Sequence, residues 1–176
     1  YKNITELNRV SAWLKEQMRL FGIPCEFQPF VINSLGYRNV ICRINNKSVE
    51  KVVIGAHYDV FATHMGANNN ASGVVATLEA ARLLALQKNK FKQDIEFVVY
   101  ALEEPPYFNT EYMGSYIHAK ALKRQKSNVK AVFILDSVGY FNENFVQNYP
   151  MGLKWIYPQH ANFIASIGHL SSAALA

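Results

Sequence analysis

Three short apolar runs constrain the fold of this chain more than any other feature of its sequence. They cover residues 51–56, 94–101 and 129–135, and amphipathic helical patterns at about 71–87 and 112–123 lie between them. Continuous apolar runs of this length are typical of strands buried on both faces, and strands that alternate with helices form parallel sheets. The sequence therefore predicts an α/β protein, a three-layer α/β/α sandwich around a mixed, mainly parallel sheet.

The N-terminal part adds a helix and an antiparallel hairpin. Apolar residues recur there at spacings of three and four: Leu7, Val10, Leu14, Met18 and Phe21. This spacing predicts an amphipathic helix that ends at Gly22 and Pro24. Two segments rich in β-branched and aromatic residues follow, 25–33 and 37–44, with a turn at 34–36 between them. They are typical of a hairpin, which would form an antiparallel margin of the sheet.

The length of the chain, 176 residues, fits a single domain over 1–176. No apolar run approaches the ~20 residues that a membrane-spanning helix needs, so we expect no membrane span. The stretch 155–176 is uncharged but is interrupted by Pro158 and several polar residues. We expect it to be a buried segment with a helix from about 158 to 170.

The net charge of +5 comes with basic clusters at 88–92 and 120–126, which fall at the ends of predicted helices. Cations complement the helix dipole there. Nucleic-acid binding would need a basic stripe with stacking aromatics, and we expect none. Nucleophile-elbow and phosphate-loop motifs are also missing, which disfavours serine hydrolases and nucleotide binding.

Cys25 and Cys42 lie in neighbouring predicted strands, so a disulfide and two free buried thiols are both open.

Metal-binding types of side chain follow each of the three apolar runs. His57 and Asp59 follow the first run, Glu103 and Glu104 the second, and Asp136 the third. Ligands of open α/β sheets bind at the carboxyl ends of the strands, and imidazole and carboxylate groups are ligands of catalytic zinc. A lone histidine or a Glu-Glu pair is usually structural or solvated. Their joint placement at three strand ends predicts a metal site, in which one carboxylate binds metal and another takes a proton from metal-bound water.

Several motifs appear in a fixed order between about residues 50 and 140. They are Gly55-Ala-His-Tyr-Asp59, Gly66-Ala-Asn-Asn-Asn-Ala-Ser-Gly73, Glu103-Glu104, Met113-Gly114-Ser115 and Asp136. This set resembles the co-catalytic zinc exopeptidases, a family that includes bacterial leucyl aminopeptidase and glutamate carboxypeptidase. The segment Glu103-Glu-Pro-Pro-Tyr-Phe108 is similar to a bacterial branch of this group.

The resemblance implies a role for each of these residues. His57 and Asp136 would bind one zinc ion, and Glu104 would bind a second. Asp59 would orient His57, and Glu103 would be the general base of a hydrolysis. The family's activity implies a peptide or aminoacyl substrate bound by its free amino terminus, as in an aminopeptidase. By the same analogy an exported location, periplasmic or secreted, is favoured, and the oligomeric state is left open.

Two departures from the family pattern put this activity in question. At Asn69 the family carries an aspartate that bridges both metals, whereas an amide offers one carbonyl oxygen and an NH2 group that cannot ligate. The site would then hold one zinc ion or none, and Asn69 would be a neutral metal ligand, a helix cap, or both. The second departure is the family's last histidine ligand, because the surroundings of His160 and His169 do not match its motif. We therefore expect the domain to be C-terminally incomplete.

Two alternative functions follow from these departures. One is a non-catalytic or metal-impaired homologue with a binding role, and the lesser one is a one-zinc glutaminyl cyclase. Four aromatic residues near the proposed ligands either line a substrate pocket or pack the loops: Tyr107, Phe108, Tyr140 and Phe141. We expect His64 to be a solvated loop residue and His118 to be structural.

Overall fold

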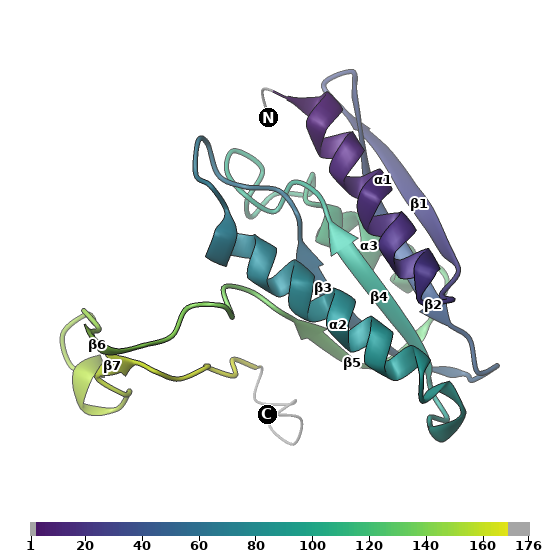
Figure 1. The fold of residues 1–176 in the computed structure, drawn as a ribbon. Coiled ribbons are helices and arrows are strands. Elements are labelled where there is room, and N and C mark those ends of the chain that lie inside the picture. The colour runs from purple at the N-terminus through teal and green to yellow at the C-terminus, as the bar shows by residue number, and fades with distance from the viewer. Residues whose placement is uncertain (1–2, 169–176) are drawn as a thin grey trace. The chain divides into compact units, whose positions relative to one another are not determined.

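The computed structural model describes residues 3–168. The chain divides into two compact units, Tyr1–Ser137 and Val138–Ala176, and each is described by itself. The prediction of a single domain over 1–176 stays a prediction. The first unit contains these helices and strands in chain order (Figure 1): α1 (Ile4–Leu20), β1 (Cys25–Ile32), β2 (Leu35–Ile44), β3 (Glu50–His57), α2 (Gly73–Ala85), β4 (Asp94–Tyr100), α3 (Gly114–Arg124) and β5 (Asn128–Ile134).

The central sheet has the strand order β1-β2-β4-β3-β5. Its core is parallel, since β3 runs parallel to both β4 and β5. Its margin is antiparallel, since β2 runs antiparallel to both β4 and β1. The predicted mixed sheet is confirmed, and the apolar run of β4 is buried as expected, with Phe97 and Val98 fully buried. The three parallel strands consequently end at the same edge of the sheet.

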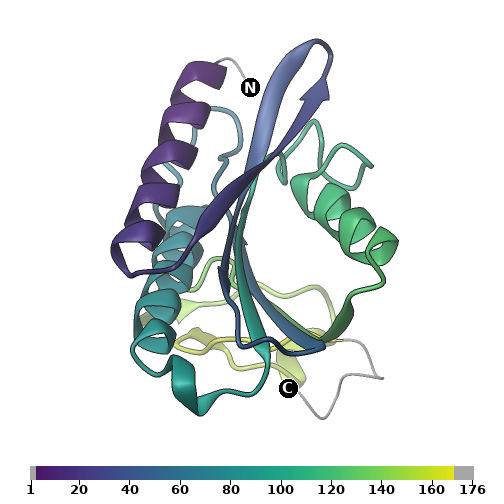
Figure 2. The same ribbon diagram turned by 90° about the vertical axis from the view of Figure 1, so that its right-hand side faces the viewer.

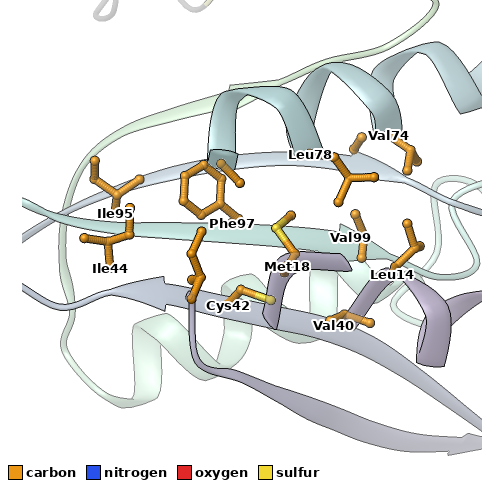
Figure 3. Packing of buried hydrophobic residues seen from close by; sticks show 13 residues of the cluster. Leu14, Met18, Val40, Cys42, Ile44, Val74, Leu78, Ile95, Phe97 and Val99 are labelled. Carbon is orange, nitrogen blue, oxygen red and sulfur yellow. The ribbon is translucent and has the colours of Figure 1, made fainter. Parts of the chain in front are cut away.

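Helices cover both faces of this sheet. α1 and α2 lie on one face and α3 lies on the other (Figure 2), which confirms the three-layer α/β/α architecture. The core under α1 and α2 combines residues of these helices with residues of β2 and β4 (Figure 3): Leu14, Met18, Val40, Val74, Leu78, Phe97 and Val99. Burial of each large apolar side chain contributes about 1.5–3 kcal/mol, so this layer holds the helices against the sheet.

The hairpin turns earlier than the sequence predicts. The turn consists of Asn33 and Ser34, which have φ angles of 49° and 65°, and β2 already begins at Leu35. A two-residue turn with positive φ at both positions matches the twist of an antiparallel pair, which explains why the predicted turn at 34–36 is displaced. In this register Cys25 lies opposite Cys42, and the two residues form a disulfide.

The second unit contains β6 (Asn142–Val146), which pairs antiparallel with β7 (His160–Ala161). The predicted helix at 158–170 is wrong for the residues that the structure describes, because 162–168 have no helical structure. Main-chain bonding in this region runs across the strands, as between Gln147 N and Gln159 O at 2.8 Å. These cross-strand bonds satisfy main-chain groups at 159–161, where the first turn of the predicted helix would lie. Residues 169–170 lie outside the described part.

The expected burial of the uncharged stretch 155–176 is wrong for most of the residues that the structure describes, although Ala161 is buried. Trp155 is 78% exposed and Ile167 is 94% exposed. An apolar composition favours burial of a segment, but the segment becomes buried only where another surface packs against it. Over residues 3–168, no helix combines the length and the apolar character that crossing a membrane requires.

Candidate active site

The side chains predicted to form a site follow the ends of the three parallel strands. His57 is the last residue of β3, with Asp59 two positions later. Glu103 and Glu104 follow β4, and Asp136 follows β5. Because β3 lies between β4 and β5 in the sheet, these chain segments meet at one edge.

His57 lies at the centre of this group and is only 6% exposed. Its Nε2 atom is 2.9 Å from Oδ1 of Asn69. The same nitrogen is 3.9 Å from Oε1 of Glu104 and 3.9 Å from Oδ1 of Asp136. The structure therefore brings together all four residues that the sequence singled out as metal ligands.

Asp59 contacts His57 through its main chain as well as through its carboxylate. The atom closest to His57 Nδ1 is the backbone carbonyl oxygen of Asp59 at 3.0 Å, whereas its carboxylate oxygen is 3.6 Å away. That carboxylate accepts hydrogen bonds from the backbone N–H groups of Glu103, at 3.1 Å, and Glu104, at 3.0 Å. Asp59 thus fixes the loop after β4 to the end of β3, in addition to contacting the imidazole.

Glu103 is held by a residue at the start of α3. The backbone N–H of Ser115 donates to one carboxylate oxygen at 2.8 Å, and its hydroxyl donates to the other at 2.7 Å. Burial raises the pKa of Glu103, the two hydrogen bonds from Ser115 oppose that rise, and the negative charge of Asp59 adds to it. The sequence alone did not assign a role to Ser115. The motif Met113-Gly114-Ser115 was the signal that could have identified it.

The loop before α2 is anchored by Asn70 rather than by Asn69. The buried Asn70 side chain donates to Leu135 O at 2.9 Å and accepts from the N–H groups of Gly73 and Ser137, each at 3.1 Å. It therefore caps α2 and ties this loop to the end of β5. The helix-capping role considered for Asn69 belongs to Asn70. The sequence did not distinguish these two residues, because they lie in a run of three consecutive asparagines.

The electrostatics of the site favour a cation. Burial by itself lowers the pKa of His57, but the hydrogen bond and charge of Asp59, together with the charge of Asp136, outweigh this and raise it to about 9. The neighbours of both ring nitrogens are oxygen atoms, so both nitrogens face acceptors. A proton or a metal ion is the group that such a cluster of acceptors stabilises.

The donor types fit zinc, whereas the spacing is slightly wide. Imidazole nitrogen and carboxylate oxygen are zinc ligands, and ligand atoms that share a tetrahedral ion lie about 3.3 Å apart. The 3.9 Å separations from His57 Nε2 exceed this value. In agreement, no group of three or more His, Cys, Asp and Glu side chains within residues 3–168 is arranged to hold a metal ion as it stands. Side-chain movements of about half an ångström would be needed for His57 and Asp136 to share one ion.

The four aromatic residues that were predicted to line a substrate pocket are divided between the two units. Tyr107 packs edge-on against Tyr37 and Tyr112, and Phe108 is 64% exposed. Tyr140 and Phe141 belong to the second unit and are exposed. The substrate pocket therefore stays a prediction.

The other histidines have distinct surroundings. The ring of His64 packs against Phe61, and His118 is buried and bonded to Glu96, which agrees with a structural role. His160 is exposed in the second unit, and His169 lies outside the described residues.

Comparison with known proteins assigns the chain to a family. The model of peptidase family M28 matches residues 39–171, and the chain therefore belongs to this family. This confirms the resemblance to zinc exopeptidases, while the assignment to a bacterial branch from residues 103–108 stays a prediction. Zinc is the metal that the family implies.

Three relatives illustrate the match. The chain is 36% identical to the Escherichia coli (strain K12) protein YfbL over 96% of its length, and 28% identical to leucine aminopeptidase 1 of Leptosphaeria maculans over 89%. It spans 54% and 44% of those proteins, which is about half of each. The structure of Porphyromonas gingivalis glutaminyl cyclase matches with a TM-score of 0.66 and 26% identity, covering 78% of this chain and 53% of that one.

Proposed function

We propose that this chain acts as a zinc-dependent exopeptidase of the aminopeptidase type, which hydrolyses N-terminal peptide bonds. The observation that carries this proposal is that the carboxylates of Glu104 and Asp136 each lie 3.9 Å from His57 Nε2 at the carboxyl edge of the sheet, beside the half-buried Glu103. Zinc held there would polarise a peptide carbonyl and lower the pKa of a water molecule towards ~7.

Each residue of the site then has a distinct task. His57 and Asp136 bind the ion, with Asn69 as a neutral neighbour and Glu104 as a further carboxylate. Glu103 accepts the proton of the attacking water as the general base, and Ser115 holds both of its oxygens so that it cannot turn away. Asp59 accepts a hydrogen bond from the backbone N–H of Glu103 and so holds the loop that carries Glu103 beside the end of β3. The family uses two ions, and one ion or none is open for this chain.

The test combines metal analysis of the purified protein with hydrolysis of aminoacyl-anilides in the presence of added zinc. We expect bound zinc and turnover, and we expect Glu103→Gln to lower kcat by about 100-fold or more because the general base is lost. The matched control is Glu111→Gln, which makes the same change at an exposed position outside the set of proposed site residues. The proposal would be overturned if the wild-type chain bound no zinc and showed no turnover.

A second candidate function is cyclisation of N-terminal glutamine. It is favoured by the similarity to Porphyromonas gingivalis glutaminyl cyclase over 78% of the chain. Peptides that begin with glutamine distinguish the two activities, because cyclisation releases ammonia and leaves the peptide bond intact. A third candidate, a metal-impaired homologue with a binding role, is favoured by the hydrogen bonds of Asn69 inside the site.

We also propose that the protein is exported to the periplasm or the medium, and that peptides or aminoacyl compounds are its partners. The disulfide between Cys25 and Cys42 supports export, because disulfides persist mainly in oxidising compartments. Cell fractionation with alkylation of free thiols tests this. Recovery in the cytosol with both thiols reduced would contradict it. The expected lack of nucleic-acid binding stays a prediction.

A further inference from the structure

The amide of Asn69 fills the space between two of the proposed ligands. Its Oδ1 atom is 2.9 Å from His57 Nε2, and its Nδ2 atom donates to Glu104 Oε1 at 2.7 Å. The two atoms that it joins, His57 Nε2 and Glu104 Oε1, are themselves 3.9 Å apart. An ion shared by His57 and Glu104 would have to displace this amide.

The chemistry of an amide makes this arrangement asymmetric. Its carbonyl oxygen can accept a hydrogen bond or ligate a cation, whereas its NH2 group can only donate. As placed here, the oxygen faces His57 and the NH2 group faces Glu104. The opposite orientation would turn the amide oxygen towards a carboxylate, which has no proton to donate when ionised. The observed orientation is therefore the one that satisfies both neighbours.

Asp136 does not share this restraint. Its side chain is 55% exposed and accepts a hydrogen bond from the hydroxyl of the adjacent Ser137 at 2.9 Å. Its Oδ1 atom can approach His57 Nε2 without breaking either bond of the Asn69 amide. A cation bound at His57 Nε2 would meet Asp136 and the Asn69 oxygen on that side, and the Asn69 NH2 group would remain on Glu104.

We infer that Asn69 withholds Glu104 from metal and that this chain binds a single zinc ion, on His57, Asp136 and the Asn69 oxygen. This inference rests on the proposed zinc site and specifies its occupancy. It predicts that the identity of one side-chain atom, nitrogen or oxygen at position 69, decides between one ion and two. In Asn69→Asp the second oxygen has no proton to donate, so Glu104 becomes available to a second ion.

Zinc content measured by mass spectrometry of the dialysed 176-residue chain provides the test. We expect about one zinc per wild-type chain and about two per Asn69→Asp chain. Asn68→Asp is the matched control, because it adds the same charge one residue earlier, at a side chain that accepts a hydrogen bond from the Ser72 hydroxyl at 3.4 Å. It should leave the content at one. Two zinc ions in the wild type would overturn the inference and leave the proposed function standing.

Glu104→Gln gives a second readout that does not depend on the folding of Asn69→Asp. In the wild-type background it should leave the zinc content at one and the dissociation constant within about threefold. In the Asn69→Asp background it should lower the content from two to one. Loss of zinc from wild-type Glu104→Gln would show that Glu104 is a ligand and would overturn the inference. Absence of zinc from both the wild type and Asn69→Asp would instead overturn the proposed zinc function itself.

Discussion

Glu103 and Glu104 are neighbours in sequence, yet their carboxylates have different partners. Ser115 donates to both oxygens of Glu103, whereas Asn69 donates to Glu104. The backbone N–H groups of both residues are held by Asp59, so the loop presents the two side chains in fixed, different directions. This division agrees with a general base at Glu103 and with a carboxylate at Glu104 that the Asn69 amide occupies.

The position of Ser115 depends on the absence of a side chain at Gly114. An added Cβ at Gly114 would lie 2.1 Å from Asn39 Oδ1 and 2.6 Å from Ala101 O. We expect Gly114→Ala to lower the free energy of unfolding by about 1–3 kcal/mol, because the buried Asn39 has to move. Gly36→Ala is the control, since its Cβ would meet nothing within 4 Å. Thermal melts in which both variants match the wild type would refute this.

A buried carboxylate away from the site dominates the charge balance under α3. Glu96 is fully buried and contacts His118, Lys51 and Arg43. Burial alone would raise its pKa, but the hydrogen bonds from these three partners lower it from 4.5 to about 2. The contribution to stability is therefore present above pH 4.5 and is lost as the pH falls towards 2.

This network predicts a defined acid sensitivity. The shift of Glu96 corresponds to on the order of 3 kcal/mol, which should disappear from the free energy of unfolding between about pH 5 and 2. Urea unfolding across this range measures it. In Glu96→Gln the protein should be less stable at pH 7 and should lose less stability on acidification than the wild type. Parallel pH profiles of the two proteins would contradict the assignment to Glu96.

At the scale of elements, the β1–β2 hairpin is held by a covalent link. Cys25 and Cys42 are 17 residues apart in sequence, and a disulfide that closes a loop of this size contributes about 3 kcal/mol. We expect the double variant Cys25→Ser with Cys42→Ser to unfold at lower denaturant by about this free energy. The reduced wild-type protein serves as the control and should behave in the same way. Equal stability of oxidised, reduced and substituted proteins would rule the contribution out.

The strand β5 lies at an edge of the sheet and exposes apolar side chains, with Val132 54% and Ile134 52% exposed. Edge strands with exposed apolar residues associate with other chains. We expect Val132→Lys to reduce self-association of the 176-residue chain at little cost in melting temperature, as measured by light scattering. Val49→Lys adds the same charge at an 84% exposed residue outside the strands and should have no such effect. An equal effect of both variants would show that charge alone is responsible.

For the molecule as a whole, local periodicity predicts the elements that bury one continuous face. The spacing of Leu7, Leu14 and Met18 and the apolar run of β4 are visible in any short window, and their burial follows. The prediction of a helix fails for 158–168, where His160 and Ala161 pair with β6 instead and 162–168 have no regular structure. The predicted hairpin turn is also displaced, because the conformation of Asn33 and Ser34 depends on the twist of the paired strands.

The amino-acid sequence by itself determined the α/β architecture, the family and the residues at the strand ends, because each of these is encoded in local patterns of polarity and in short motifs. Only the tertiary structure decided how those residues are paired. Ser115 meets Glu103, and Asn69 joins His57 to Glu104, across segments that are far apart in the chain. The physical reason is that hydrogen bonding depends on the direction of individual donors and acceptors, which is defined only after the strands and helices have packed.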